Sequence, residues 1–461
     1  MKIFFCASEM VPFAKTGGLA DVAGALPLAL ELLGHEVVVT LPRYKAIANE
    51  KFKIQKVKEG VSVTTAGRDI KVYLIEQEKY FGRDSLYGDK TGDYKDNLER
   101  FSFFCTRSLE LLKEMKFKPE VCHCHDWQSA LVVAYLKNVY QADPFFKDTR
   151  AVFTIHNLAY QGLFPREEFP QTGLDPSLFS IEGFEFYGKV NLLKAGLEYS
   201  DLITTVSPTY SREIQTKEFG CGLEGVLNKR RDCVFGILNG IDYTIWSPST
   251  DKMIAKHYSV ETAAEKARNK EDLQALCRLP KKPGVPLFGI VSRLAEQKGF
   301  DIIAEGINEI MTMDLQLVIL GTGDLKYHVL LEEMVKKYPK VISLSLKFDD
   351  SLAHKIYAGS DIFLMPSRYE PCGLGQIISL SYGTVPLVFK TGGLADTVTS
   401  DNGFVFDDYR KTALIKTIAK SLQAFKDKSG WRRLVQKAMG YNFSWEESAK
   451  KYVGLYKKAR K

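Results

Sequence analysis

The stretch KIFFCASEMVPFAKTGGLADVAGALPLALELLG, residues 2–34, decides the fold class of this chain. It begins with KIFFCA (2–7), an apolar run with the length and composition of a buried β-strand. It ends with DVAGALPLALELLG (21–34), in which leucine and alanine recur at helical spacing up to Gly34. A loop with paired glycines joins the two. Strand, glycine loop and helix in this order indicate one βα unit of a parallel sheet.

The same alternation of strand and helix signals continues through the chain. In the first half the strand candidates are EVVVTL (36–41), IKVYLI (70–75), VCHCH (121–125), AVFTI (151–155), LITTV (202–206) and VFGIL (234–238). In the second half they are LFGIV (287–291), LQLVIL (315–320), VISLSL (341–346), DIFLMP (361–366), VPLVF (385–389) and GFVF (403–406). The two series are separated by a polar, proline-containing segment, IDYTIWSPSTD (241–251).

This pattern predicts an α/β protein with two Rossmann-like, doubly wound parallel-sheet domains. We place the first domain at residues 1–243 and the second at residues 244–442. Residues 443–461 have the pattern of one amphipathic helix, which we expect to cross back to the first domain. A chain of 461 residues is long enough for two or three domains.

Composition excludes several classes of protein. A content of 45% hydrophobic and 26% charged residues is ordinary for a soluble globular protein, and no apolar run approaches the length that spans a bilayer. The N-terminus, MKIFFCASEM, does not have the pattern of a secretory signal, and eight scattered cysteines do not suggest a disulfide framework. We therefore expect a cytoplasmic protein with reduced thiols and no membrane partner. The net charge of +7 is mild and no nucleic-acid-binding module is recognisable, so we expect no nucleic-acid partner.

Metal sites are not indicated either. In the run Cys122-His123-Cys124-His125 the cysteines and the histidines point to opposite faces of a strand, so the four side chains cannot close around one ion. The chain also contains no D-x-D sequence that would hold Mg²⁺. We predict no metal site.

The heptapeptide KTGGLAD occurs twice, at residues 15–21 and 390–396. Each copy lies between a predicted strand and a predicted helix, at the carboxyl edge where open α/β sheets bind ligands. Glycines allow a phosphate to approach the backbone, and the start of the next helix directs N–H groups toward an anion. The alternative is a tight strand-to-helix turn, and for the second copy both interpretations remain open. Lys15 beside the first pair of glycines favours anion binding there.

Two further segments carry candidate binding residues. In SRLAEQKG (292–299), Arg293 and Lys298 could hold a diphosphate, although either could be an ordinary surface cation. In SRYEPCGLGQ (367–376), Glu370 precedes a glycine-rich helix start and could bind sugar hydroxyls or simply cap the helix.

The motifs taken together resemble one family, the bacterial glycogen synthases and plant starch synthases. Besides both copies of TGGLAD, SRLAEQKG and PSRYEPCGL, the resemblance rests on HDW (125–127), HNLAYQG (156–162), VSPTYSREI (206–214), GCGLEGVL (220–227) and ILNGID (237–242). The resemblance implies the glycosyltransferase B fold, in which two Rossmann-like domains face a deep cleft. It also implies transfer of glucose, with retention, from a nucleotide-sugar donor, usually ADP-glucose, to the non-reducing end of an α-1,4-glucan such as glycogen, starch or a maltooligosaccharide.

The resemblance also implies roles for individual residues. Catalytic roles fall to Glu370, His156, Asp126 and Lys15. Donor-binding roles fall to Lys15, Gly17, Gly18, Asn239, Arg293, Lys298, Phe348, Gly373 and Leu374. Within this set the two cations of SRLAEQKG bind the diphosphate, and Phe348 lies against the adenine. The family needs neither a metal ion nor pyridoxal phosphate, so we expect no cofactor.

Several alternatives stay open at this level. Retention can follow from a covalent intermediate on Asp126 or Glu370, or from a front-face reaction in which the leaving phosphate takes the acceptor proton; we expect the second. Another retaining transferase of the same fold, with UDP-glucose as donor or a sucrose-type or trehalose-type product, would share the phosphate-binding residues. A glucan phosphorylase would require pyridoxal phosphate. A non-catalytic glucan-binding relative is the alternative from a different class.

Overall fold

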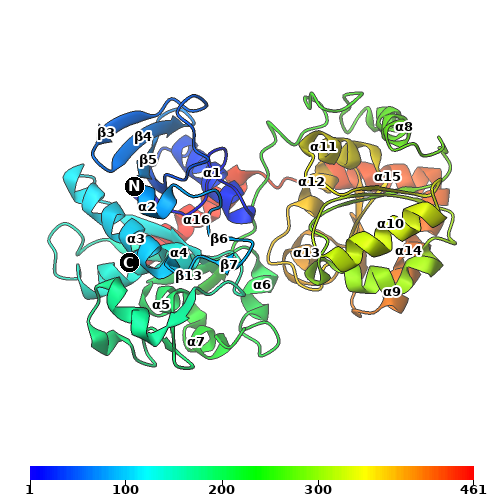
Figure 1. The fold of residues 1–461 in the computed structure, drawn as a ribbon. Helices are drawn as coiled ribbons and strands as arrows, with labels where there is room; N and C mark the ends of the chain where they lie inside the picture. The colour runs from blue at the N-terminus through cyan, green and yellow to red at the C-terminus, as the bar shows by residue number, and fades with distance from the viewer. The chain divides into compact units, whose positions relative to one another are not determined.

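The computed structural model describes residues 1–461 and divides into two units, each built on one large sheet (Figure 1). Unit 1 comprises Met1–Gly240 and Trp445–Lys461, and unit 2 comprises Ile241–Ser444. The units thus divide after Gly240 and after Ser444, whereas the sequence placed these boundaries at 243 and 442. The backbone N–H of Ile241 donates to the carbonyl of Phe443 at 2.8 Å. The segment in which the chain enters unit 2 is therefore paired with the segment in which it leaves.

The large sheet of unit 1 has nine strands in the order β14-β13-β9-β8-β1-β2-β5-β4-β3. Seven of them run parallel: β1 (Lys2–Cys6), β2 (Glu36–Pro42), β5 (Ile70–Ile75), β8 (Val121–His125), β9 (Arg150–Ile155), β13 (Leu202–Thr205) and β14 (Val234–Gly236). These are the seven strands that the sequence predicts. An antiparallel edge made of β3 (Gln55–Lys58) and β4 (Val61–Ala66) was missed because its residues are largely polar.

Helices and two small sheets complete unit 1. The helices are α1 (Gly18–Leu32), α2 (Glu78–Phe81), α3 (Asn97–Glu114), α4 (Asp126–Asn138), α5 (Leu192–Tyr199), α6 (Pro208–Glu213), α7 (Glu224–Lys229) and α16 (Trp445–Ala459). The small sheets consist of β10 (Leu163–Pro165), β12 (Lys189–Asn191) and β11 (Glu185–Phe186), and of β6 (Gly88–Asp89) and β7 (Gly92–Asp93). Their strands are too short to leave a periodic signal in the sequence.

The last helix, α16, packs within unit 1 beside α1, and Figure 1 shows the red and blue ribbons side by side. Its lysines remain at the surface while its tyrosines enter the core. The Tyr456 hydroxyl is hydrogen-bonded to Nδ1 of His123 on β8 at 2.8 Å. Ser448 Oγ donates to the carbonyl of Leu238 at 2.6 Å. The final segment therefore belongs structurally to the unit in which the chain begins.

The sheet of unit 2 has six parallel strands in the order β17-β16-β15-β18-β19-β20. They are β15 (Leu287–Val291), β16 (Gln316–Leu320), β17 (Ile342–Ser345), β18 (Ile362–Met365), β19 (Val385–Phe389) and β20 (Phe404–Phe406). The helices are α8 (Lys266–Leu276), α9 (Phe300–Ile310), α10 (Leu325–Lys337), α11 (Asp350–Gly359), α12 (Gly375–Ser381), α13 (Gly392–Thr397), α14 (Lys411–Lys426) and α15 (Lys428–Met439). The sequence predicts all six strands.

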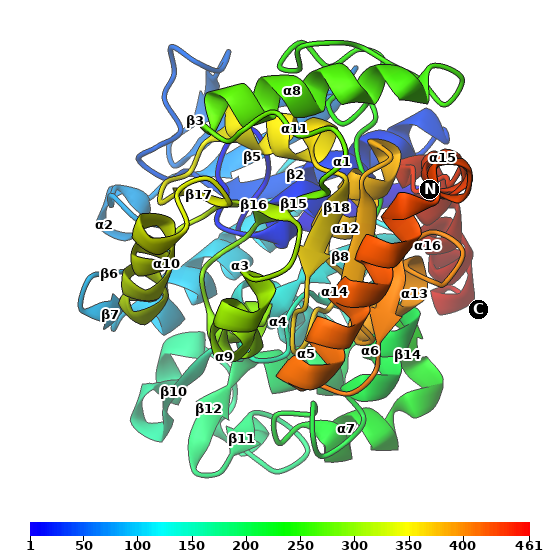
Figure 2. The same cartoon turned by 90° about the vertical axis from the view of Figure 1, so that its right-hand side faces the viewer.

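Helices cover both faces of this sheet, as Figure 2 shows for unit 2. Neighbouring residues of β15 enter different cores because successive side chains of a strand point to opposite faces. Phe288 and Ile290 pack in one cluster with residues of α9, α10 and α14. Leu287 packs in another with residues of α8, α11 and α12. Burial on both faces explains why the parallel strands of unit 2 read as continuous apolar runs.

The cysteines and the histidines of β8 follow the predicted alternation. The rings of His123 and His125 lie together, with centroids 4.1 Å apart, and burial raises the pKa of the Cys122 and Cys124 thiols. All eight cysteines are free. No group of three or more histidine, cysteine, aspartate or glutamate side chains is arranged to hold a metal ion. No helix is both long enough and apolar enough to cross a lipid bilayer.

The hydrogen bond of the buried Tyr456 hydroxyl on α16 yields a stability prediction. Tyr456→Phe removes the partner of His123 Nδ1 without opening a cavity, so we expect the free energy of unfolding to fall by about 1 to 2 kcal/mol. Tyr160→Phe is the matched control, because the Tyr160 side chain is exposed. Denaturant unfolding followed by circular dichroism measures both variants. Equal stability of the two would contradict a structural role for this hydrogen bond.

Candidate active site

The order of strands reverses at one point in each sheet. In unit 1 the reversal lies between β1 and β8, and in unit 2 between β15 and β18. At such a switch point the connections leave toward opposite faces, so the carboxyl ends of the two central strands remain uncovered. Lys15 follows β1 and Asp126 follows β8, while Arg293 follows β15 and Glu370 follows β18. Residues far apart in the sequence therefore occupy the two switch points.

Residues 15–18 of the first KTGGLAD segment are exposed, and their backbone is already bound by a carboxylate of the protein itself. Glu9, which is 3% exposed, accepts hydrogen bonds from the Thr16 hydroxyl at 2.6 Å, from the Gly17 N–H at 3.2 Å and from the Thr16 N–H. Lys15 Nζ lies 2.7 Å from Asp21 Oδ1. The Gly17 N–H is therefore used within the protein, and the prediction that Gly17 and Gly18 bind the donor remains a prediction. A ligand can still reach Lys15 and the first N–H of α1, at Gly18.

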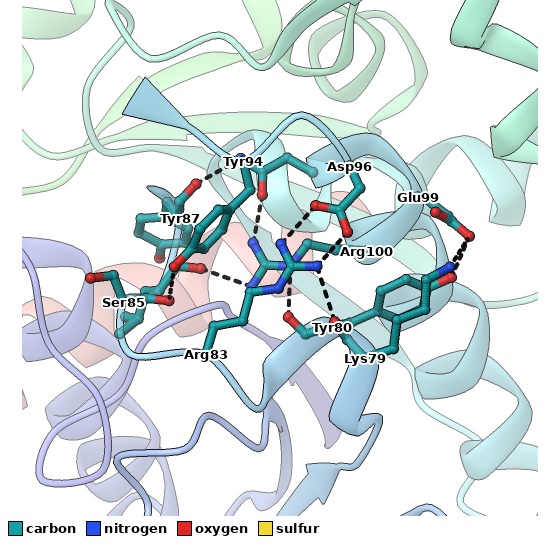
Figure 3. Close-up of polar contacts among 11 residues, drawn as sticks. Lys79, Tyr80, Arg83, Ser85, Tyr87, Tyr94, Asp96, Glu99 and Arg100 are labelled. Carbon is teal, nitrogen blue, oxygen red and sulfur yellow. Dashed lines mark hydrogen bonds and ion pairs between the residues drawn. The ribbon is translucent and has the colours of Figure 1, made fainter. Parts of the chain in front are cut away.

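Glu9 is itself held in place by the segment before α3. The Tyr87 hydroxyl donates to Glu9 Oε1 at 2.7 Å, and the Tyr87 carbonyl accepts from Asn97 Nδ2 at 2.9 Å. Arg100, fully buried on α3, donates to the carbonyls of Tyr80 at 2.8 Å and Leu86 at 3.0 Å (Figure 3). These contacts fix the backbone that carries Tyr87, and through Glu9 they fix the glycine loop.

A second arginine reinforces the same segment. Arg83 makes two parallel hydrogen bonds to Asp96, at 2.8 and 2.5 Å, in the bidentate geometry of a guanidinium and a carboxylate (Figure 3). The Tyr94 ring lies 4.6 Å from the Arg83 guanidinium and 5.0 Å from that of Arg100. Neither arginine nor Glu9 stood out in the sequence, because nothing local marks which charged residues are buried, as Arg100 and Glu9 are, or paired, as Arg83 is.

The second KTGGLAD segment is buried, in contrast to the first. A Cβ added at Gly392, where φ is +42°, would lie 1.9 Å from the Glu370 carbonyl oxygen. One added at Gly393 would lie 2.1 Å from the Cys372 carbonyl oxygen. The Gly393 N–H donates to the Glu370 carbonyl at 3.0 Å. Close packing against the loop that carries Glu370 thus accounts for both glycines of this copy, a reason that the sequence did not suggest.

Asp126 and His156 form the centre of the edge in unit 1. Asp126 begins α4 with φ at +54°, an uncommon conformation that clusters at functional sites. Its Oδ1 accepts the backbone N–H of His156 at 2.8 Å, and burial raises the pKa of this carboxyl to about 7. Burial lowers the pKa of His156 to about 3, so its imidazole is neutral. Its Nε2 lies 3.0 Å from Nδ1 of His125.

Asn239 follows β14 at the same edge of unit 1. Its side chain is buried, yet its Oδ1 has no hydrogen-bond partner within the protein. A buried carbonyl oxygen without a donor is costly, which is what a residue that awaits a ligand donor would show.

In unit 2 the Glu370 carboxylate is paired. Lys298 Nζ lies 2.6 Å from Glu370 Oε2, and the Ser367 hydroxyl donates to the same oxygen at 3.0 Å. Arg293 is exposed, and its Nη2 donates only to Gln297 Oε1, at 3.2 Å. The two cations thus share one loop but differ in function here: Lys298 neutralises Glu370, whereas most donors of Arg293 remain open to a ligand.

Three predicted donor contacts lie at other strand ends or helix starts of unit 2. Gly373, with φ at +74°, and Leu374 precede α12. Phe348 lies between β17 and α11, and its side chain is 88% exposed.

Comparison with known protein families gives two matches. Residues 2–229 match the model of the starch synthase catalytic domain, and residues 277–434 match that of glycosyl transferases group 1. The chain is 52% identical to a glycogen synthase from Geotalea uraniireducens, over 100% of this chain and 99% of the relative. It is 44% identical to a glycogen synthase from Thermotoga petrophila, over 100% and 99%.

Two solved structures show the same architecture. The catalytic domain of starch synthase IV from Arabidopsis thaliana, bound to ADP and acarbose, superposes with a TM-score of 0.91 at 33% sequence identity, covering 100% of this chain and 99% of that one. Sucrose-phosphate synthase from Thermosynechococcus elongatus superposes with a TM-score of 0.62 at 18% identity, over 99% and 98%. The second likeness shows the fold alone.

The two glycine pairs predict opposite responses to the same substitution. Gly393→Ala forces a Cβ against the Cys372 backbone, and we expect it to lower the free energy of unfolding by about 1 to 3 kcal/mol or more. Gly18→Ala, at the same place in the other heptapeptide, meets open space, and we expect a change within about 0.5 kcal/mol. Denaturation midpoints of both variants test this. A larger loss at Gly18 would refute the assignment.

The raised pKa of Asp126 predicts a pH-dependent stability. Between about pH 4, where an aspartate in the unfolded chain ionises, and about pH 7, the folded protein holds a proton that the unfolded chain has lost. This contribution is complete below pH 4 and disappears as the pH rises through 7. Relative to Asp126→Asn, the wild type should therefore lose about 2 to 3 kcal/mol of stability between pH 5 and pH 8. Chemical denaturation at both pH values measures the difference, and a pH-independent difference would contradict it.

Proposed function

The chain belongs to the glycogen and starch synthase family of glycosyltransferases, and on that premise we propose that it transfers glucose from a nucleoside diphosphate glucose to an α-1,4-glucan. The architecture is the glycosyltransferase B fold, with two α/β units built on parallel sheets. The observation that carries the proposal is the 52% identity to a glycogen synthase over the full length of both chains. We propose ADP-glucose as the donor and the non-reducing end of the glucan as the acceptor.

The edge of unit 2 supplies the charge that the leaving diphosphate needs. Breaking the bond between sugar and phosphate leaves negative charge on the nucleotide, and cations held in place beforehand stabilise it in the transition state. Arg293 offers an open guanidinium fork, and Lys298 adds a point charge already oriented by Glu370. With these cations in place the proposal requires neither a metal ion nor pyridoxal phosphate. The exposed Phe348 ring is available to stack on the base.

The edge of unit 1 supplies groups suited to sugar hydroxyls. The neutral His156 imidazole and the unpartnered Asn239 Oδ1 are uncharged hydrogen-bonding groups, and the Asp126 carboxyl accepts the backbone N–H of His156. Lys15, whose ammonium is paired with Asp21 but half exposed, and the N–H of Gly18 are accessible to phosphate or hydroxyl oxygens.

The free state of all eight cysteines supports a cytoplasmic location as part of the proposal.

For the retained configuration we propose the front-face route. The Glu370 carboxylate is held by Lys298 and Ser367, an arrangement suited to binding hydroxyls and less suited to attack on carbon. Trapping with a slow fluorinated donor, followed by mass spectrometry, tests this. A glucosyl adduct on Asp126 or Glu370 would overturn the front-face route and leave the overall reaction unchanged.

The donor is tested by a competition assay. The purified chain is given ADP-glucose and UDP-glucose in turn, with glycogen as acceptor, and α-1,4-linked product is measured. We expect turnover with ADP-glucose to be the faster. Sucrose-type or trehalose-type products would point to another transferase of this fold, and glucan binding without turnover would indicate a non-catalytic relative.

The role of Arg293 yields a kinetic prediction. Arg293→Ala removes the open guanidinium, and we expect kcat/KM for the nucleotide sugar to fall about 10- to 100-fold, with stability almost unchanged because the side chain is exposed. Lys282→Ala is the control: Lys282 is equally exposed but precedes β15, at the opposite edge of the sheet. Initial rates over a range of donor concentrations compare the two. Equal losses would mean that Arg293 does not bind the donor.

A further inference from the structure

His125, the last residue of β8, contacts the side chain of His156, and neither the sequence motifs nor the proposed reaction gives it a role so far. It is completely buried. Its Nδ1 and the Nε2 of His156 are 3.0 Å apart, a hydrogen-bond distance. One of these nitrogens must therefore carry the hydrogen and the other must accept it.

Only one proton lies between the two rings. Burial holds the pKa of His125 and of His156 well below the ordinary value, so both imidazoles are neutral and each carries a single N–H. If His156 Nε2 donates, then His125 carries its own hydrogen on Nε2. If His125 Nδ1 donates, then His125 Nε2 is bare and His156 carries its hydrogen on Nδ1. The surroundings of His125 Nε2 distinguish the two arrangements.

His125 Nε2 is enclosed and has no hydrogen-bond partner. The rings nearest to it do not provide one. Phe5 and His123 lie with centroids at 4.7 and 4.1 Å and interplanar angles of 32° and 38°, so both cover the face of the His125 ring. An N–H lies in the plane of its ring and would meet neither face. Because buried N–H groups without an acceptor are rare, Nε2 carries no hydrogen.

We propose that His125 donates from Nδ1 to His156 Nε2 and thereby fixes His156 as the tautomer with hydrogen on Nδ1. His156 Nδ1 makes no hydrogen bond within the protein, and His156 keeps 9% of its surface exposed at the carboxyl end of β9. The backbone of His156 is held separately by Asp126. The site therefore presents an N–H donor, which binds a hydroxyl oxygen of the sugar. His125 is a positioning residue, since it acts through His156.

The assignment of the tautomer follows from the geometry alone, whereas the contact with a sugar rests on the proposed function. Neutron diffraction from crystals of the full chain exchanged into D₂O tests the first part directly. We expect deuterium on Nδ1 of both His125 and His156 and none on His125 Nε2. Deuterium on His125 Nε2 would overturn the proposal.

Two variants of nearly equal size test the effect on catalysis. His125→Asn places an amide N–H near the position of Nδ1, whereas His125→Leu has no donor. We expect His125→Asn to retain kcat/KM within about threefold and His125→Leu to lose about 10-fold or more, at similar thermal stability, because one hydrogen bond to the sugar is lost. Equal activity of the two variants would overturn the positioning role. If the wild type forms no glucan from any nucleotide sugar, the proposed function fails, while the neutron result still decides the tautomer.

Discussion

The reversal of strand order in each sheet is the constraint on which the rest of the structure depends. Between β1 and β8, and between β15 and β18, the connecting helices depart toward opposite faces and leave two strand ends without a cover. This is why Lys15 and Asp126 in unit 1, and Arg293 and Glu370 in unit 2, lie at these points.

The glycine loop of unit 1 and Glu370 of unit 2 are each held by a polar contact with the rest of their unit. Glu9 holds the first glycine loop, and Tyr87 and the segment fixed by Arg100 hold Glu9. In unit 2, Lys298 holds Glu370. Such contacts are strong in a low-dielectric interior and costly to leave unpaired, so they favour one arrangement of the site before a ligand arrives.

The repeated heptapeptide shows how far context outweighs local sequence. In unit 1 its glycines are exposed and a methyl group would meet nothing, whereas in unit 2 the same glycines touch the backbone of the Glu370 loop. The first copy lies exposed at the candidate site of unit 1, and the second packs against the loop that carries Glu370. The same residues thus serve two physical purposes, access in one unit and close packing in the other.

The sequence by itself determined the order of strands and helices, because buried parallel strands and amphipathic helices have different periods, and it identified the charged residues at the strand ends. It missed the polar edge strands β3 and β4, whose pattern is weak. Only the tertiary structure decided that the Gly17 N–H is taken by Glu9, that Lys298 pairs with Glu370, and that His125 lies behind His156. These contacts join residues from different strands and loops, and no local pattern encodes which of them meet once the sheets have formed.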